Sequence, residues 1–353
     1  MRVPPLVTGE PQVLSPLEVP DWDRQTDAFR SAGVFHQTAW VRTLSETYGI
    51  RPAFLAWFDA GRLVAVLPMM ECRGLLGGRT GVSLPFTDSC SPLHLENGPT
   101  GPYWAVDAAL AAARRSGWQF VELRSGDARL RSRASTSFLG HELDLSPGRQ
   151  SLFERCAPSV RRAVRRAGTE GLKLDFAHGA AAVEDYYHLH CLTRKRHGLP
   201  PQPWRFFLSL ARNLVDGRTG FVARARLGSR IVAAAVFLTN GRRAIYKYGA
   251  SLQEFQHLRA NNLVMWESIV RLTETGHLSL DLGRTSFGNE GLRRFKRGWG
   301  ATETEIFCCR LRAADGAVLP MQDRSSGWHT SLFRRMPVSL LKLLGSALYR
   351  FQT

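Results

Sequence analysis

The sequence is short of lysine. Only five of its 47 basic residues are lysine, so 42 are arginine, and 30 acidic residues leave a formal net charge of +17. Such an excess attracts phosphate, nucleic acid or an anionic membrane surface, but it says nothing about the fold. Because a GC-rich genome also favours arginine over lysine, the charge alone leaves open whether a polyanion is the partner.

The sequence also shows no metal-binding motif, no long apolar run and no signal-peptide pattern. The six cysteines form no C-x-x-C pair and show no histidine spacing typical of zinc. We therefore expect buried free thiols, no metal site and a reducing compartment. No stretch reaches the ~18 apolar residues of a membrane span, and the first residues lack the apolar core of a signal peptide. We expect a cytoplasmic protein.

Several catalytic and binding motifs are absent as well. There is no Ser-His-Asp order, H-E-x-x-H helix, Walker lysine loop or dinucleotide fingerprint. This argues against serine hydrolases, zinc peptidases, P-loop enzymes and nicotinamide-dependent enzymes. Nucleic-acid-binding signatures are missing too, and the arginines are spread over the whole chain.

What the sequence does contain is a duplicated α/β pattern. A chain of 353 residues suits two domains. Each half has a predicted hairpin, one around Asp59-Ala60-Gly61 and one around Gly228-Ser229, followed by a helix that ends in glycine and a short strand. The helices and strands are expected at 102–117 and 118–125, and at 261–276 and 277–285. The repetition predicts two related α/β units, over 1–145 and 146–315, with a tail at 316–353.

Two predicted helices carry many basic residues. The helix within 156–171 has an apolar stripe on one side and, on the other, Arg161, Arg162, Arg165 and Arg166. These arginines either bind an anion or form a solvated face. The tail helix at 336–351 is amphipathic and basic. It either docks on its own domain or lies on a membrane surface.

Three stretches stand out as candidates for chemistry: "HLHCLTRKRHGLPPQPWRFF" (188–207), "AIYKYGAS" (244–251) and "DLGRTSFGNEGLRRFKRGWG" (281–300). Three of the five lysines fall in them. Strand alternation in the second stretch predicts Tyr246 and Tyr248 on one face and Lys247 on the other.

These residues carry a family resemblance. "YKYGAS", "NNLVMWESIV" and "LSLDLGRTSFGNEGLRRFKRGWGA" resemble the FemABX-like branch of the GNAT acyltransferase superfamily, and within it the FemAB-related proteins of bacterial polysaccharide and exosortase systems. The similarity spans roughly residues 35–312. The D-x-G-R…R-F-K…W-G pattern is its most specific element.

The resemblance implies an α/β fold of tandem GNAT-like domains, each a mixed central sheet flanked by helices, with a C-terminal amphipathic helix. It implies an enzyme that forms an amide bond, with acyl-CoA or aminoacyl-tRNA as co-substrate and no tightly bound cofactor. The expected acceptor is an amine on a phosphate-bearing cell-wall peptide or a nucleotide- or lipid-linked sugar. The expected partner is therefore this acceptor. The tRNA is a partner if the donor is aminoacyl-tRNA, and the inner membrane is one if the helix at 336–351 lies on a membrane surface.

The resemblance also places Lys296 at the acyl-transfer channel and Arg196 at the acceptor phosphate. Attack on an acyl carbonyl develops an oxyanion that a fixed cation stabilises, a role that suits Lys296. The attacking ammonium needs a base, for which Asp281 and Tyr248 are candidates. The alternatives are that Asp281 pairs with Arg284 and that Tyr248 packs in the core. The further substrate-binding candidates are Lys195, Lys247, Arg259, Arg284, Arg293 and Arg297.

One loop departs from the GNAT pattern. Members that bind acetyl-CoA have a Q/R-x-x-G-x-G/A loop whose backbone N–H groups hold the pyrophosphate. This chain has "QHLRAN" at 256–261 instead, in which Arg259 is the candidate phosphate contact. The alternative functions are a non-catalytic nucleic-acid-binding protein and a membrane-peripheral assembly protein.

Overall fold

The computed structural model describes residues 9–74, 77–99, 101–217, 219–321 and 329–351. Its contacts divide the chain into two compact units. The first comprises Met1–Leu139, Thr304–Asp323 and Arg350–Thr353, and the second Gly140–Glu303 and Arg324–Tyr349. The chain therefore crosses from the first unit at 139/140, a few residues before the expected boundary. It returns to the first unit at 303/304, and part of the expected tail lies outside the described residues.

The second unit is built on a mixed sheet. In the strand order given below, each of the first four strands is antiparallel to its neighbour, and the fourth and fifth strands are parallel to each other. The predicted hairpin is confirmed, with Leu227 opposite Arg230. The order is β10 (Leu172–Ala177), β11 (Gly220–Leu227), β12 (Arg230–Asn240), β13 (Arg243–Ser251), β14 (Ser279–Thr285) and then β9 (Thr136–Asp144), which enters this unit at Gly140.

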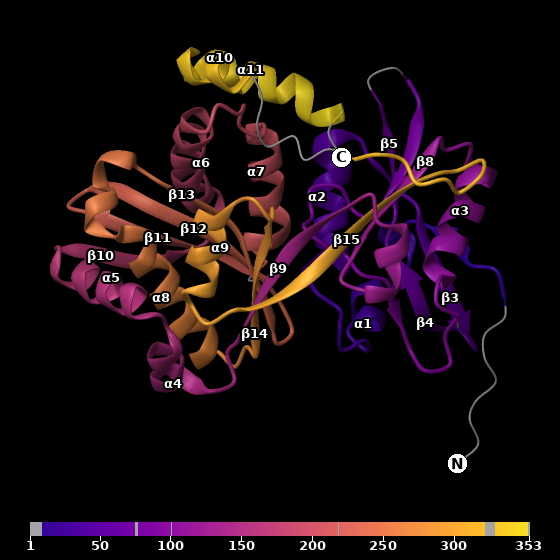
Figure 1. The fold of residues 1–353 in the computed structure, drawn as a ribbon, viewed down its shortest axis with the longest axis horizontal. Helices are drawn as coiled ribbons and strands as arrows, with labels where there is room; N and C mark the ends of the chain where they lie inside the picture. Colours follow the sequence, from indigo (N-terminus) through magenta and orange to yellow (C-terminus); the bar gives the residue numbers. More distant parts are fainter. Residues whose placement is uncertain (1–8, 75–76, 100, 218, 322–328, 352–353) are drawn as a thin grey trace. The chain divides into compact units, whose positions relative to one another are not determined.

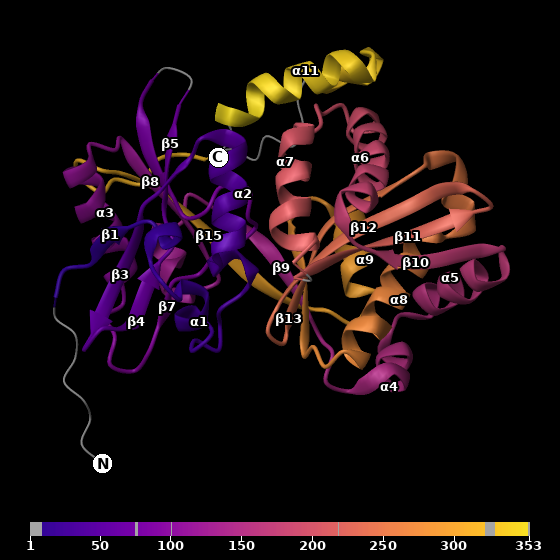
Figure 2. The same ribbon diagram turned by 180° about the vertical axis from the view of Figure 1, so that it is seen from behind.

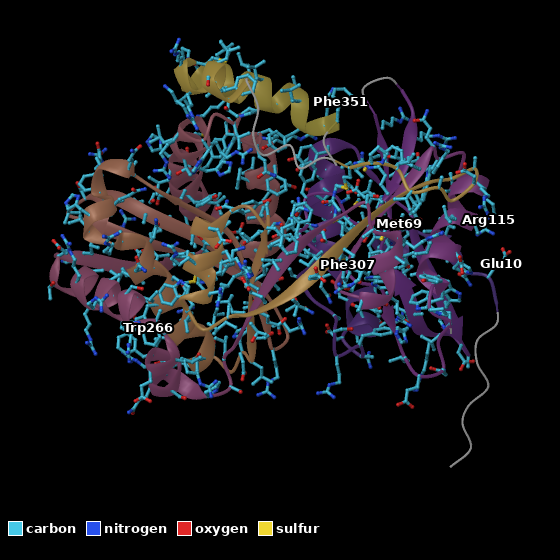
Figure 3. All side chains as sticks on the ribbon, viewed as in Figure 1. Glu10, Met69, Arg115, Trp266, Phe307 and Phe351 are labelled. Carbon is cyan, nitrogen blue, oxygen red and sulfur yellow. The ribbon has the colours of Figure 1, made fainter. Side chains whose placement is uncertain are left out.

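Helices cover both faces of this sheet (Figures 1 and 2). On one face lie α6 (Gly179–Arg196) and α7 (Trp204–Leu210); on the other lie α4 (Gly148–Arg155), α5 (Pro158–Thr169) and α8 (Ala260–Glu274). The apolar stripe expected from the sequence faces the core in α5, where Val160 and Val164 are buried. Trp266 of α8, labelled in Figure 3, is buried in the same core.

The first unit has two sheets. The predicted hairpin is confirmed, with Asp59 opposite Arg62, and the predicted helix ends at Gly117, which has φ +68°. One sheet has the order β1 (Gln12–Leu14), β3 (Phe54–Asp59), β4 (Arg62–Leu67) and β7 (Leu93–His94). The other has β15 (Thr302–Arg312), β8 (Phe120–Ser125), β6 (Arg79–Val82), β5 (Met70–Arg73) and β2 (Arg51–Pro52). The helices are α1 (Trp22–Thr26), α2 (Thr38–Tyr48) and α3 (Trp104–Ser116).

The repeat is therefore less regular than the sequence suggests. In the second unit the hairpin β11–β12 belongs to the sheet that contains β14, whereas in the first unit the hairpin β3–β4 belongs to a different sheet from β8. The tandem α/β architecture itself is confirmed. Among the described residues, no helix is long and apolar enough to cross a membrane, and no group of three acidic, histidine or cysteine side chains is placed to hold a metal ion.

Candidate functional site

The site is built where two parallel strands of the second unit separate. β13 and β14 pair only from Arg243 to Ile245 on one side and from Ser279 to Asp281 on the other. Both strands continue beyond this point, to Ser251 and Thr285. Because parallel strands end at the same edge of a sheet, residues at these two ends lie along one edge.

A β-bulge corrects the predicted alternation in β13. Tyr246 pairs with Phe237 and Tyr248 with Val236, so Lys247 is the inserted residue. An inserted residue shifts the alternation of the side chains that follow it. Tyr246 packs with the core beneath α8, whereas Tyr248 packs with rings of α6 and α7. The two tyrosines therefore do not share a face, and the Lys247 Nζ lies 5.3 Å from the ring centroid of Tyr248.

The corresponding strand pair of the first unit is closed. β6 and β8 pair in parallel, and directly after β6 a further hydrogen bond of 2.7 Å runs from Ser83 N to Glu122 O. Arg124 Nη1 then donates to Thr87 O across 3.0 Å. Glu122, fully buried, accepts from both Arg124 and Arg310. Burial would raise the pKa of Glu122, but these guanidinium groups outweigh it and hold the pKa below its usual range. The inner carboxylate of this unit is therefore a structural ion-pair centre.

Lys296 is fixed at the separating end of β14. It lies on α9 (Glu290–Arg297), whose first turn is capped by Asn289 Oδ1, which accepts from Leu292 N. Only 4% of Lys296 is exposed, and its Nζ donates to Gly283 O at 2.9 Å and Arg284 O at 2.8 Å. A cation held by backbone carbonyls in a nearly dry environment is a preorganised source of positive charge.

Asp281 supports the same strand end. Its Oδ1 accepts from Gly283 N at 2.7 Å, and Gly283 has φ +74°, a left-handed conformation that favours glycine. The carboxylate therefore fixes the turn whose carbonyl holds Lys296.

His141 and Glu303 belong to this cluster, although the sequence did not single them out. His141, on β9, is buried, and neither ring nitrogen has a hydrogen-bond partner. Burial, followed by the charge of Lys296, lowers the pKa of His141 to about 4, so the ring is neutral near pH 7. Its Nε2 lies 3.8 Å from Glu303 Oε1. No sequence motif separates His141 from an ordinary strand residue, because its neighbours come from other elements.

The charged residues of α9 differ in their surroundings. Arg293 donates two hydrogen bonds to the carboxylate of Glu303, of 2.8 and 3.0 Å, and is therefore held in an ion pair. Arg297, by contrast, is exposed. Arg284 is half-buried directly after Gly283. Of the predicted α9 cations, Arg297 is therefore the better placed to meet a phosphate.

Three elements meet at the end of β13. Ser251 O accepts from Thr193 Oγ1 and Arg196 Nη1, each at 3.4 Å, and Ser251 Oγ accepts from Asn261 Nδ2 at 2.9 Å. The C-terminal end of α6, with Lys195 next to Arg196, is thus joined to the first turn of α8.

Arg259 precedes α8 as its N-cap residue and has a left-handed conformation, with φ +59°. It occupies the position of the first glycine in the Q-x-x-G-x-G/A pattern, so the backbone keeps a glycine-like conformation although the residue has changed. No side chain caps this helix start. A helix N-terminus without such a cap presents backbone N–H groups that suit phosphate, and the exposed Arg259 adds a charge.

An aromatic cluster lies behind Tyr248. Tyr186 OH is 3.0 Å from His190 Nδ1, and His190 Nε2 is buried without a hydrogen-bond partner. Burial, followed by the charge of Arg194, lowers the pKa of His190 to about 3. Tyr248 packs on Tyr186 and Phe207, which is the packing role anticipated as its alternative.

The predicted site residues thus form two groups along one sheet edge. The group at the end of β14 and on α9 comprises Lys296, Asp281, Arg284, Arg293 and Arg297. The group at the end of β13 and the adjoining ends of α6 and α8 comprises Lys195, Arg196, Lys247, Tyr248 and Arg259.

Comparisons with known proteins identify a domain and a fold. Residues 155–297 match the family model of the acetyltransferase (GNAT) domain. No curated protein matches the sequence. Among solved structures, the chain is similar to FemX, with 14% identity, a TM-score of 0.66, and coverage of 84% of this chain and 96% of FemX.

Two further solved structures share the fold. A tandem GNAT protein from the clavulanic acid biosynthesis pathway is 12% identical over 87% of this chain and 99% of its own, with a TM-score of 0.55. The C-terminal domain of a candidate lysylphosphatidylglycerol synthetase from Agrobacterium fabrum is 14% identical over 93% and 96%, with a TM-score of 0.53. At these identities the likeness shows the fold.

Residues 155–297 of the second unit therefore match a GNAT domain, and most of the chain shares the fold of FemX and of a tandem GNAT protein. The expected resemblance to the GNAT superfamily is confirmed by the domain match, and the resemblance to the FemAB-like branch is confirmed as a shared fold. The match to an acetyltransferase domain and the fold shared with FemX support an N-acyltransferase.

Proposed function

We propose that the chain transfers an acyl or aminoacyl group from acyl-CoA or aminoacyl-tRNA to an amine. The acceptor is a phosphate-bearing, cell-envelope or nucleotide- or lipid-linked sugar or peptide. The observation that carries the proposal is the buried Lys296 ammonium at the separating ends of β13 and β14, inside a GNAT domain.

The chemistry follows from this placement. The acceptor amine attacks the carbonyl carbon of the thioester or ester, a C–N bond forms, and the carbonyl oxygen becomes an oxyanion. The positive charge of Lys296 stabilises that oxyanion. The tetrahedral intermediate then collapses, the bond to the carrier breaks, and the proton lost by the nitrogen balances the one gained by the leaving thiolate or alkoxide.

Phosphate recognition is assigned to the other end of the site. GNAT enzymes use acyl-CoA as co-substrate, and the start of α8 with Arg259 suits the pyrophosphate of such a carrier. Arg196 and Lys195, at the end of α6, suit the phosphate of the acceptor. The name of the lysylphosphatidylglycerol synthetase from Agrobacterium fabrum, which shares this fold, supports an aminoacyl donor and a cell-envelope setting.

Carrier release tests the proposal. The protein is incubated with an acyl-CoA mixture or with charged tRNA, each with and without phosphorylated amino-sugar acceptors. Acceptor-dependent release of free thiol or of deacylated tRNA is expected. Release from neither carrier with any amine acceptor contradicts the proposal.

A further inference from the structure

All the charged residues in the tail of the chain are positive. Residues 324–353 contain no Asp or Glu and five basic residues, Arg324, Arg334, Arg335, Lys342 and Arg350. The described part of this tail forms two helices, α10 (His329–Arg335) and α11 (Val338–Leu348). Both lie along α6 of the second unit (Figures 1 and 2).

One face of α11 is docked. Leu341 has no exposed surface, and Tyr349 OH accepts from Arg194 Nη2 at 2.7 Å and lies 3.4 Å from Pro200 O. Gly345 approaches so closely that a Cβ there would lie 1.9 Å from Pro201 O. The docking anticipated as one alternative is therefore present.

The other face of α11 is apolar and exposed. Leu343 follows Leu341 by two residues, which is about 200° around the helix axis. Leu343 is 69% exposed and Leu340 42%, while Leu332 of α10 is 51% exposed. A helix with leucines on two opposite faces, only one of them buried against the protein, presents a second apolar surface to something else.

The surroundings of this exposed face are mainly cationic and aromatic. Arg334 and Arg335 are exposed on α10, and the Lys342 Nζ lies 5.2 Å from the ring centroid of Tyr187. Beside Leu343 an open groove of about 560 Å³ is also lined by Tyr187, Trp204 and one acidic side chain, Glu184. Tyrosine and tryptophan favour the membrane–water interface, where one end of the ring system is apolar and the other hydrated.

We propose that the exposed face of α10 and α11 binds the surface of an anionic phospholipid bilayer. The leucines enter the boundary between headgroups and acyl chains, and the tail's cations meet the lipid phosphates. A nucleic acid would use the same cations but gives no role to Leu340 and Leu343, because its binding is dominated by phosphate contacts. The proposal does not depend on the acyl-transfer assignment.

Vesicle binding tests this surface without removing the docked helix. The full chain is sedimented with vesicles of phosphatidylcholine, with or without one-third phosphatidylglycerol. Binding to the anionic vesicles alone is expected, falling as salt rises. The double variant Leu340→Glu/Leu343→Glu should lose about tenfold or more in partitioning, because both the apolar contact and the local positive charge are reduced.

The matched control is Leu278→Glu, at a leucine that is 39% exposed elsewhere in the second unit; it should bind like the parent. Thermal unfolding of all three proteins checks that they are folded. The proposal is overturned if the parent does not prefer anionic vesicles, or if the double variant binds as well as the control. It is also overturned if the tail binds only RNA, with the leucine substitutions without effect.

Discussion

His190 shows at the residue scale how burial decides charge. Its ring is enclosed by Tyr186, Phe207 and Tyr248, and its pKa of about 3 lies below the ordinary value of 6.5. The unfolded chain therefore binds a proton more readily than the folded one. The contribution of neutral His190 to the free energy of unfolding is therefore fully present above pH 6.5 and is lost as the pH falls below that value.

A pH series of urea unfolding measures this effect. Between pH 6.5 and pH 4, the free energy of unfolding should fall by up to about 1.4 kcal/mol per pH unit for each buried neutral histidine. His190→Phe should remove one such contribution and flatten the dependence. His188→Phe, at an exposed position of the same helix, should keep the parent's slope, and an equally steep slope in His190→Phe contradicts the account.

Arg259 combines a strained backbone with a useful charge. A side chain in the left-handed region costs roughly 1 kcal/mol, so Arg259→Gly should raise the free energy of unfolding by about 0.5–1 kcal/mol, whereas Arg259→Ala should not. Both variants should raise the KM for the acyl carrier, since both lose the cation. Urea midpoints and carrier titrations measure the two effects; equal stability of the two variants would show that φ is relaxed in solution.

The site was only partly predictable from its residues. Lys296 was reached through the family resemblance, and its burial on a capped helix explains why it differs from its exposed neighbours. His141 and Glu303 were not reached, because they come from β9 and β15 and meet Lys296 and Arg293 only in the folded unit. Contacts between distant segments leave no spacing in the sequence.

At the scale of elements, periodicity and turn residues predicted the hairpins and helices well. Two features escaped. The bulge at Lys247 reversed the predicted face of Tyr248, since a bulge is a property of strand pairing. Helix α9 was not predicted because its segment carries many arginines and lies between glycines. Its cap is a single hydrogen bond, from Leu292 N to the side chain of Asn289.

The docking of α11 depends on one glycine. Gly345→Ala would place a methyl group against the Pro201 carbonyl, so the helix should lift from α6 or shift. We expect faster hydrogen exchange and proteolysis in residues 338–349. Gly168→Ala, in helix α5 with nothing within 4 Å, is the matched control and should stabilise the protein slightly because alanine favours helix. Equal protection of α11 in both variants would contradict the packing described.

At the scale of the molecule, the two units share a pattern of elements but differ at the end of their parallel strand pairs. The strand pair of the first unit is closed by Ser83 and Arg124, and its carboxylate, Glu122, is held between two arginines. The strand pair of the second unit separates and carries the lysine, the neutral histidine and the uncapped helix start. Acyl transfer is therefore assigned to the second unit, while the basic tail adds a separate surface.

We assign to the charge of Lys296 the stabilisation of the transition state of acyl transfer. Once a carrier and acceptor are found, the decisive measurement is kcat for Lys296→Met, with Lys173→Ala, an exposed lysine on β10, as the control. Methionine keeps the apolar stem but removes the charge, so kcat should fall about 100-fold or more. Circular dichroism checks that the variant is folded under the conditions of the assay. Lys173→Ala should match the parent. A folded Lys296→Met protein with the parent's kcat would show that Lys296 only ties α9 to β14, and would contradict the account.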